Sequence, residues 1–366
     1  MTSFDKSAVD VAQLSVGELN RVTKNLLGEV PEKSWKLSNG ACAANYGVEF
    51  FDKMRAVIKA VVGDDSESLA ANQLSVLNSL NGSRVSPDLL CDRSVSCVTT
   101  DGAKACAVAM EFVDGDAANV LVRDKGFEPV MCYGAVGTAL GSLHALKRPT
   151  SRIRNDLGHD RYLETFIRLP QELEASVTQL LSSSPESHTV AFGHWLLTDS
   201  RLPSARKALG RQDLPRGLLH GDPYADNVVL QIVDGAVRRA TLVDWEDVAV
   251  GPLAYDLASA LVACAFNFHT KEDTAIFDKH VAKALIDNYA KCRPSFSKLE
   301  ALALTDLMLA NVLACATYRW HHFNVVAPDS SPDAKASYEE MLAIASAIEA
   351  KAGTKVTDLA LAAVAS

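Results

Sequence analysis

The fold is decided by one stretch, residues 218–258, which reads LLHGDPYADNVVLQIVDGAVRRATLVDWEDVAVGPLAYDLA. Two short apolar runs within it, 228–230 and 240–243, are rich in β-branched residues. The turn signal Asp234-Gly235 lies between them. Apolar β-rich runs on either side of an Asp-Gly turn are typical of a β-hairpin. We therefore expect two antiparallel strands at the centre of this stretch.

Three polar residues stand at the ends of these runs. Asp222 follows the leading apolar pair, Asn227 comes five positions later, and Asp244 ends the second run. The hairpin would bring Asn227 and Asp244 close together, with Asp222 at the mouth of the same loop. Phosphoryl transfer needs metal ligands and a group that orients the attacking hydroxyl. Carboxylate and amide oxygens are ligands suited to Mg²⁺ beside phosphates, so the pattern suits this chemistry.

The same letters carry a family resemblance. H-G-D-x-x-x-x-N at 220–227, D-W-E at 244–246 and G-P-x-x-Y-D-L-A at 251–258 occur in this order. Together they resemble the group of aminoglycoside phosphotransferases, choline kinases and homoserine kinases. The resemblance implies an α+β, protein-kinase-like fold with two lobes. It also implies ATP and Mg²⁺ as the groups bound between the lobes.

The resemblance assigns a role to each polar residue of the stretch. It implies that Asp222 is the catalytic base or hydroxyl-positioning residue, and that Asn227 and Asp244 are magnesium ligands. In this group the histidine at the position of His220 braces the loop by hydrogen bonds. Taken singly, each piece has a simpler reading, since Asp-rich turns are common and Asp256 could cap or anchor a helix.

The composition is that of an acidic globular protein. The 366 residues are 48% apolar and 22% charged, with a formal net charge of −9. Nucleic-acid binding needs a basic stripe, so we expect no nucleic-acid partner. No stretch approaches the roughly 18 uninterrupted apolar residues of a membrane span, so we expect no membrane partner. The eight cysteines are scattered and the N-terminus has no signal-like segment, which indicates a cytoplasmic protein with reduced thiols.

Residues 1–111 are predicted to form the small, nucleotide-binding lobe. The run 54–62 is predicted to be a strand, and it contains Lys59 among apolar neighbours. A buried lysine without a partner is unfavourable. Lys59 resembles the strand lysine that binds phosphates in kinases. The alternative is a lysine on the exposed face of an edge strand.

Two further residues of this lobe are candidates for the nucleotide site. Glu67 begins a helix predicted over 65–80 and is the candidate partner of Lys59, although a helix dipole favours a first-turn glutamate by itself. Gly40 lies in the turn of a hairpin predicted over 35–51, where kinases have their phosphate loop. An ordinary hairpin turn is the alternative reading of Gly40.

The lobes are predicted to join near residue 111, and 112–366 form the catalytic and substrate-binding lobe. A hairpin is predicted over 95–110, and 110–113 are the expected hinge. In the family, backbone groups at the hinge meet the adenine edge, which makes Glu111 and Val113 cofactor-binding candidates. The glycine-rich segment 137–146 is predicted to be a closely packed helix in which His144 has a structural role. Helices are also predicted over 8–28, 160–185, 187–210, 255–266, 275–291, 298–319, 335–351 and 355–365.

The acceptor is a small molecule with a hydroxyl group. The segment 288–325 is similar to that of homoserine kinases, which makes Arg319 a candidate for binding a substrate carboxylate. A helix-end arginine paired with a surface acid is the alternative. D-W-E is nearer to the aminoglycoside and choline relatives, so Glu246 and Trp320 are candidates for a cationic amine.

The sequence thus predicts an ATP-dependent kinase acting on a homoserine-like amino acid or a choline-like amino alcohol. Aminoglycoside or sugar phosphorylation is the alternative within the same chemistry. A catalytically silent kinase-like binding protein is a second class of hypothesis. A metal-dependent hydrolase is a third, and the absence of a His/Asp metal motif from the sequence argues against it.

Overall fold

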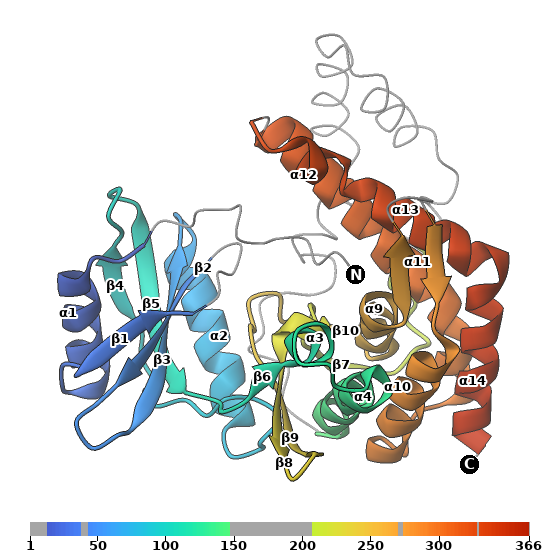
Figure 1. The fold of residues 1–366 in the computed structure, drawn as a ribbon, viewed down its shortest axis with the longest axis horizontal. Helices are drawn as coiled ribbons and strands as arrows, with labels where there is room; N and C mark the ends of the chain where they lie inside the picture. The colour runs from blue at the N-terminus through green and yellow to red at the C-terminus, as the bar shows by residue number, and fades with distance from the viewer. Residues whose placement is uncertain (1–12, 38–42, 147–206, 270–273, 328, 366) are drawn as a thin grey trace.

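The N-terminal part of the chain is built on one antiparallel sheet (Figure 1). The computed structural model describes residues 13–37, 43–146, 207–269, 274–327 and 329–365. The five strands lie side by side in the order β1-β2-β3-β5-β4. Their bounds are β1 Lys33–Lys36, β2 Ala43–Glu49, β3 Arg55–Val62, β4 Val95–Val98 and β5 Lys104–Glu111. The strands predicted in this region are confirmed.

Side-chain alternation lets both faces of this sheet be covered. In β5, Ala105, Ala107 and Ala109 pack in one apolar cluster, whereas the intervening Cys106, Val108 and Met110 pack in the other. Helix α1 (Val16–Leu27) contributes to the first cluster and helix α2 (Ser66–Leu80) to the second, because successive side chains of a strand point to opposite faces. The sheet is therefore sandwiched between the two helices.

The start of α1 differs from the predicted helix over 8–28. Residues 13–15 are not helical, and Ser15 caps the helix by accepting a hydrogen bond from the backbone N–H of Glu18. A serine whose hydroxyl oxygen accepts from the backbone N–H three residues later is a common N-cap, so Ser15 sets the start of the helix. The predicted helix over 65–80 is confirmed as α2.

A short strand and two helices follow the sheet and lead into the helical part of the molecule. Gly137 and Gly141 of the second helix face the backbone of a later helix so closely that an added Cβ would lie 2.1 Å and 2.5 Å from the carbonyl oxygens of Leu285 and Tyr289. The predicted close packing of this glycine-rich helix is therefore confirmed. The elements are β6 Asp116–Ala117, α3 Ala118–Arg123 and α4 Pro129–Ala145.

The hairpin predicted from the 218–258 stretch is present. Strands β8 (Val228–Val233) and β9 (Ala236–Leu242) pair antiparallel around Asp234 and Gly235, which both have positive φ. Strand β7 (Arg216–Leu219) pairs with β10 (Ala249–Pro252) instead of joining the hairpin. The ends of β7 and β8 therefore meet in the loop that carries Asp222.

The remaining chain is mostly helical. Helices appear where they were expected, with two differences. The apolar helix ends at Cys264, and a short hairpin follows that was not predicted. The second strand of this hairpin occupies 274–277, so the helix predicted over 275–291 begins only at Lys279. The predicted helix over 160–185 lies outside the described residues, as does most of the one over 187–210, of which residues 207–209 are described and are helical. The elements are α9 Ala254–Cys264, β11 Phe266–His269, β12 Thr274–Phe277, α10 Lys279–Cys292, α11 Lys298–His321, α12 Pro332–Ala336, α13 Tyr338–Ala347 and α14 Gly353–Ala365, with π-helical turns at His322–Val326 and Ile348–Ala352.

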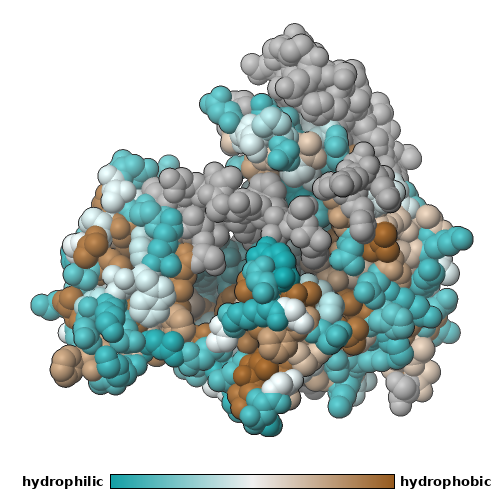
Figure 2. Space-filling model, viewed as in Figure 1, coloured by the Kyte–Doolittle hydropathy of each residue, from teal (hydrophilic) through white to brown (hydrophobic). Residues whose placement is uncertain are grey.

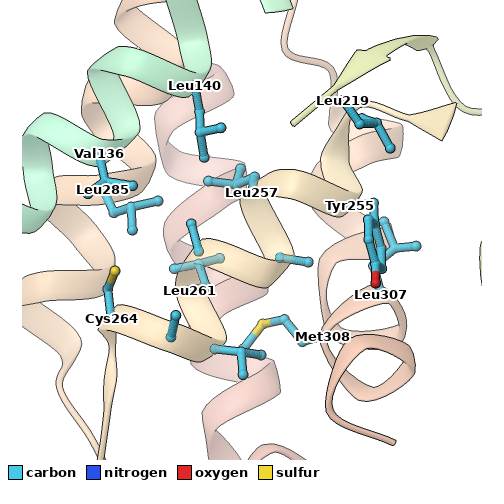
Figure 3. Packing of buried hydrophobic residues seen from close by; sticks show 14 of the residues in the cluster. Val136, Leu140, Leu219, Tyr255, Leu257, Leu261, Cys264, Leu285, Leu307 and Met308 are labelled. Carbon is cyan, nitrogen blue, oxygen red and sulfur yellow. The ribbon is translucent and has the colours of Figure 1, made fainter. Parts of the chain in front are cut away.

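Helices α9 and α11 form the core of this helical part (Figure 3). Figure 3 shows Leu257 and Leu261 of α9 pointing towards Leu140 of α4, with Met308 of α11 close by. Length and composition alone would allow a helix spanning Lys298–Asn324 to cross a membrane, but 67% of its most apolar window is buried in the fold. Burial among α9, α13 and α14 is the environment of a core helix.

The outer surface agrees with the composition. Figure 2 shows polar residues over most of the visible face, with apolar residues gathered in small patches. The seven cysteines that the structure describes are free thiols; Cys42 lies outside the described residues.

Candidate active site

Asp222 and Asn227 face one another across the loop between β7 and β8. The side-chain amide of Asn227 donates hydrogen bonds to the backbone oxygen of Asp222 at 2.9 Å and to its carboxylate at 2.8 Å. A short 3-10 turn at Ala225–Asn227 provides the spacing. The predicted proximity of Asp222 and Asn227 is therefore present, with Asn227 orienting the carboxylate.

The backbone around the site has two unusual conformations. Gly221 has a φ of +88°, and a Cβ there would lie 1.9 Å from the backbone oxygen of Asp247. Only glycine fits such a position, which explains the middle residue of H-G-D. Asp244 has a φ of +65°, a region that non-glycine residues rarely adopt. Strain of this kind is found mostly at functional sites, where neighbouring contacts hold the residue in place.

Lys59, in strand β3 of the N-terminal sheet, reaches Asp244 at the end of the hairpin. Its ammonium forms an ion pair with the Asp244 carboxylate and another, at 2.9 Å, with Glu246. Lys59 is 4% exposed, and β3 lies in the middle of the sheet, so the edge-strand reading is excluded. Burial alone would lower the pKa of Lys59, but the charges of Asp244 and Glu246 outweigh it and raise that pKa.

Asp256 holds the backbone of the loop that carries Asp222. Its buried carboxylate accepts hydrogen bonds from the backbone N–H of His220 at 2.7 Å and of Gly221 at 3.1 Å. The His220 ring contacts the backbone oxygen of Val243 at 2.9 Å, and burial lowers its pKa, which favours the neutral ring. The bracing role expected for His220 and the anchoring role considered for Asp256 therefore agree with these contacts.

One candidate for the nucleotide site, Glu67, does not lie beside Lys59 in the structure. Glu67 is exposed in the first turn of α2 and accepts a hydrogen bond from Ser96 at 3.1 Å. The expected pair between Glu67 and Lys59 is therefore wrong for this structure, because the acid lies at the end of the helix and Glu246 stands beside the lysine instead. Gly40 lies outside the described residues.

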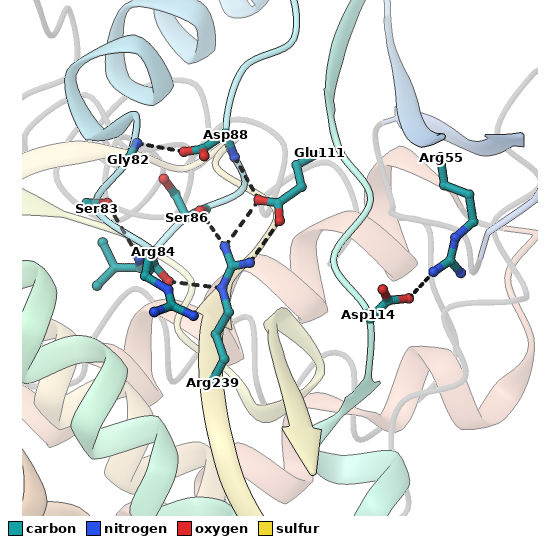
Figure 4. Close-up of polar contacts among 10 residues, drawn as sticks. Arg55, Gly82, Ser83, Arg84, Ser86, Asp88, Glu111, Asp114 and Arg239 are labelled. Atoms are coloured by element: carbon teal, nitrogen blue, oxygen red, sulfur yellow. Dashed lines mark hydrogen bonds and ion pairs between the residues drawn. The ribbon is translucent and has the colours of Figure 1, made fainter. Parts of the chain in front are cut away.

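At the hinge, the Glu111 side chain binds an arginine of the protein (Figure 4). Its carboxylate binds the Arg239 guanidinium at 2.8 Å and 3.1 Å, and its backbone N–H donates to Asp88 at 2.8 Å. Arg239 also donates to the backbone oxygens of Arg84 and Ser86 at 3.4 Å. We name Glu111 and Arg239 the hinge pair.

The second hinge candidate differs from Glu111. Within the described ranges, no hydrogen bond reaches the backbone of Val113. Its N–H and C=O groups are therefore the ones that remain available for the edge of a base.

Two of the three substrate candidates occupy other positions than expected. Glu246 pairs with Lys59, and so belongs to the phosphate side of the site. Trp320 is completely buried, so its ring offers no face to a substrate cation and that prediction is wrong. Buried Ala316 and Leu313 precede it at helical spacing, which puts all three on the inward side of α11.

Arg319 is the substrate candidate that the structure keeps near the loop. Its guanidinium donates to the Glu340 carboxylate at 2.9 Å and to the backbone oxygen of Ser337 at 3.1 Å. The alternative reading, an arginine paired with an acid, therefore describes its present contact. Burial and nearby charges, among them Asp222, raise the pKa of Tyr224, whereas Arg319 acts in the opposite sense. Tyr224 thus lies within electrostatic reach of both residues.

The oxygen atoms that this loop offers as metal ligands suit a hard cation. Because Asn227 uses its amide nitrogen on Asp222, its amide oxygen is the atom left for a cation, and Asp244 adds carboxylate oxygens. In the part of the chain that the structure describes, no group of three or more His, Cys, Asp or Glu side chains could hold a metal alone. The set therefore fits Mg²⁺ shared with phosphate oxygens and water better than an all-protein cage.

Two residues of the site were missed from the sequence. Glu340 was missed because it reaches Arg319 from a different helix, 21 positions along the chain. Arg239 was missed because its partner Glu111 is 128 positions away. Neither stands in a motif; the only signal for Arg239 was a charged pair, Arg238-Arg239, within a strand of the catalytic hairpin.

Comparison with known proteins finds relatives of this chain. The chain is 27% identical over 189 residues to a homoserine kinase of Methylobacterium radiotolerans, covering 51% of this chain and 49% of that protein. It is 26% identical over 259 residues to a homoserine kinase of Phenylobacterium zucineum, covering 70% of each. The chain thus spans about half the length of the first relative.

A solved structure shows the same fold. The amicoumacin kinase hAmiN, in complex with AMP-PNP, Ca²⁺ and Ami, superposes with a TM-score of 0.58 at 13% identity, over 96% of each chain. This likeness confirms the predicted α+β, protein-kinase-like fold. The sequence model described as the phosphotransferase enzyme family (APH) matches residues 52–295, more than half of the chain. The chain therefore belongs to the phosphotransferase enzyme family, as its motifs indicated.

Proposed function

We propose that this protein transfers the γ-phosphoryl group of MgATP to the hydroxyl of a small, homoserine-like amino acid or amino alcohol. The observation that carries the proposal is that Lys59 of β3 pairs with Asp244, which follows directly after Val243, and that the N–H of Val243 donates to the backbone oxygen of Asn227 at 2.9 Å. Asp222, oriented by Asn227, stands on one side, and Lys59 with Asp244 and Glu246 stands on the other. We name Lys59, Asp244 and Glu246 the lysine cluster.

In this proposal Asp222 accepts the hydrogen bond of the substrate hydroxyl. The contact from Asn227 at 2.8 Å restricts the rotation of the carboxylate, so that it can hold the hydroxyl in line for attack. Late in the reaction, the proton of the substrate hydroxyl would pass to the Asp222 carboxylate. This role requires no change in the backbone of the loop, because Asp256 already holds it from below.

Lys59 would neutralise phosphate charge in the proposed reaction. Mg²⁺, held by the oxygens of Asn227 and Asp244, would supply charge neutralisation of the triphosphate. Lys59 is now shared between two carboxylates, and phosphate oxygens would compete with these for its N–H groups. The backbone of Val113 would meet the edge of the base.

The acceptor class follows from the pair of charges near Tyr224. Arg319 and Glu340 stand together, so the site presents a cation and an anion within one contact of 2.9 Å. A zwitterion such as an α-amino acid complements both, with its carboxylate towards Arg319 and its ammonium towards Glu340. The names of the two homoserine kinase relatives favour the same class.

A catalytically silent binding protein is the second candidate. The observation that favours it is the exposed position of Glu67, which leaves Lys59 without the helix glutamate expected of an active kinase. The contact with Glu246 offers the lysine a carboxylate from another segment, so we favour the enzyme.

A coupled ADP-release assay with MgATP tests the proposal. The acceptor panel is homoserine, choline, ethanolamine, hydroxylysine, methylthioribose and an aminoglycoside. We expect turnover with homoserine or a close analogue, lowered about a thousandfold in Asp222→Ala. Asp213→Ala is the matched control, because Asp213 is an exposed acid paired with Arg211 just before β7.

Nucleotide binding separates the two candidates. Thermal-shift measurements should show that Asp222→Ala still binds MgATP, since Asp222 is assigned to the acceptor. Binding of MgATP without turnover for any acceptor of the panel would count against the kinase and favour the silent protein. Turnover with the aminoglycoside alone would overturn the amino-acid assignment but keep the chemistry.

A further inference from the structure

A line of buried polar side chains runs from the floor of the catalytic loop into the helical core. It begins at Asp256 of α9, whose carboxylate accepts the backbone N–H groups of His220 and Gly221. The Nε2 atom of His144, at the end of α4, lies 3.1 Å from the same carboxylate. Both Asp256 and His144 have completely buried side chains.

The line continues through α10 to α11. The hydroxyl of Tyr289 lies 2.8 Å from Nδ1 of His144, and Arg293 donates to that hydroxyl at 2.8 Å. Arg293 also donates to the Glu300 carboxylate at 2.6 Å. Tyr289, Arg293 and Glu300 are at most 2% exposed. We name these five residues the polar line: Asp256, His144, Tyr289, Arg293 and Glu300.

The hydrogens of this line can be ordered from one end to the other. A guanidinium has only donors, so the Tyr289 oxygen accepts from Arg293. Burial raises the pKa of Tyr289, and the hydroxyl therefore keeps its proton. That proton has Nδ1 of His144 as its acceptor. His144 then carries its own proton on Nε2, where the Asp256 carboxylate accepts it.

The other arrangements satisfy fewer of these contacts. A His144 protonated on Nδ1 alone would point a lone pair from Nε2 at the Asp256 carboxylate. A doubly protonated ring would leave the hydroxyl proton of Tyr289 without its partner in a site closed to water. Buried polar groups without partners are unfavourable, so the arrangement with the proton on Nε2 satisfies the most contacts.

We propose that Tyr289 and Arg293 are positioning residues for phosphoryl transfer. They hold His144 in the Nε2–H form, and His144 with two backbone amides then fixes the Asp256 carboxylate. Through Asp256 they set the backbone of the loop that carries Asp222. The inference rests on the proposed function for its kinetic effect, but the loop contact exists independently of any substrate.

The helices do not depend on the Tyr289 hydroxyl for their packing. Gly137 and Gly141 let α4 approach the backbone of α10, and the Tyr289 ring packs edge-on against Phe296 at 5.3 Å between centroids. Tyr289→Phe keeps the ring and removes one oxygen atom. It therefore tests the polar line with little change in the apolar core.

Steady-state kinetics of Tyr289→Phe give the first readout. We expect kcat to fall about tenfold, while KM for MgATP and for the acceptor changes by less than about twofold, because the loop geometry and not substrate binding is altered. Tyr133→Phe is the matched control, since Tyr133 is a buried tyrosine of α4 outside the polar line. A Tyr289→Phe enzyme with unchanged kcat would overturn the proposal.

Hydrogen exchange gives a readout that needs no turnover. The backbone N–H groups of His220 and Gly221 should exchange faster in Tyr289→Phe than in the wild type, and at the wild-type rate in Tyr133→Phe. This arm tests the polar line even for a protein that phosphorylates nothing in the panel. Unchanged exchange in Tyr289→Phe would overturn the proposal without touching the proposed function.

A double-mutant cycle tests whether the effect passes through His144. In His144→Gln the side-chain amide offers an N–H to Asp256 without any tautomer to be selected. We expect Tyr289→Phe to have no further effect on kcat in this background. Additive losses would mean that Tyr289 acts elsewhere, and would overturn the assignment to His144.

Discussion

The lysine cluster and the polar line both lie next to the loop that carries Asp222, and they are built in opposite ways. In the lysine cluster one ammonium faces two carboxylates, and the side chains of Asp244 and Glu246 are 26% and 19% exposed. The polar line is buried throughout, and each of its contacts passes from a donor to an acceptor.

The difference separates what a ligand changes from what holds the site in place. The lysine cluster has an excess of negative charge and partial access to water, so arriving cations or phosphates can rearrange it at little cost. The polar line links all five of its residues without a ligand, and among its side-chain polar atoms the Nε of Arg293 is the buried one that lacks a hydrogen-bond partner. Buried networks of this kind are rigid when complete and destabilising when one member is removed.

The strongest test of this comparison is to break the polar line at Asp256. In Asp256→Asn an amide nitrogen or its oxygen faces three donors, and at least one buried N–H group loses its acceptor. We expect the free energy of unfolding, measured with urea, to fall by about 3 kcal/mol. Turnover should fall as well, because the loop that carries Asp222 loses hydrogen bonds that hold its backbone.

Asp278→Asn is the matched control for Asp256→Asn. Asp278 also accepts two backbone N–H groups, those of His280 and Val281, but at the partly exposed start of α10. Asn is about as good an N-cap as Asp, so we expect a change below about 0.5 kcal/mol. Equal losses in the two variants would show that burial of the line is not what matters.

The second test removes the cation of the lysine cluster. In Lys59→Met the carboxylates of Asp244 and Glu246 lose their shared partner, and phosphate charge loses one donor. We expect kcat/KM for ATP to fall about a hundredfold. We also expect Mg²⁺ to raise the melting temperature more than in the wild type, since a cation would then relieve the repulsion.

Lys33→Met is the control for Lys59→Met. Lys33 pairs with Glu49 on the surface of the same sheet, and its side chain is 62% exposed. It should leave both kcat/KM and the response to Mg²⁺ unchanged. A Lys59→Met enzyme with wild-type kcat/KM would remove Lys59 from the proposed site.

The comparison also explains which features of the site the sequence could predict. Asp222, Asn227 and Asp244 belong to one hairpin, so the Asp234-Gly235 turn and the β-rich runs were enough to bring them together. Lys59 meets Asp244 from 185 positions away, and only the resemblance to kinases indicated that meeting. The pairing of Lys59 with Glu246 had no local signal, because the sequence does not tell which carboxylate an incoming lysine will face.

Two of the wrong predictions had a signal in the sequence. Helical spacing puts Trp320 in line with Ala316 and Leu313, which indicates burial and not a substrate contact. The first-turn position of Glu67 indicates an exposed helix end. The polar line could not be predicted, because its contacts join four helices whose packing no local pattern specifies.

The smallest expected effect concerns the hinge pair, whose side chains are on average more exposed than those of the lysine cluster or the polar line. Arg239 and Glu111 are 17% and 32% exposed, and they join a strand of the catalytic hairpin to the end of β5. In Glu111→Gln the ion pair becomes a hydrogen bond from the charged guanidinium of Arg239 to an uncharged amide oxygen. We expect the free energy of unfolding at pH 7 to fall by about 1 kcal/mol or less.

The pH dependence of this loss distinguishes the hinge pair from the polar line. The hydrogen bond from Arg239 lowers the pKa of Glu111 despite its partial burial. The contribution of Glu111 is therefore fully present above the usual glutamate pKa of about 4.3, and it disappears as the pH falls through the lower folded-state value. Urea unfolding of wild type and Glu111→Gln should differ at pH 7 and converge in acid. Glu18→Gln weakens a similar contact with Arg21 and should give the smaller difference, because the Arg21 side chain is 46% exposed to water. A difference for Glu111→Gln that persists in acid would show that the contact acts through shape and not through charge.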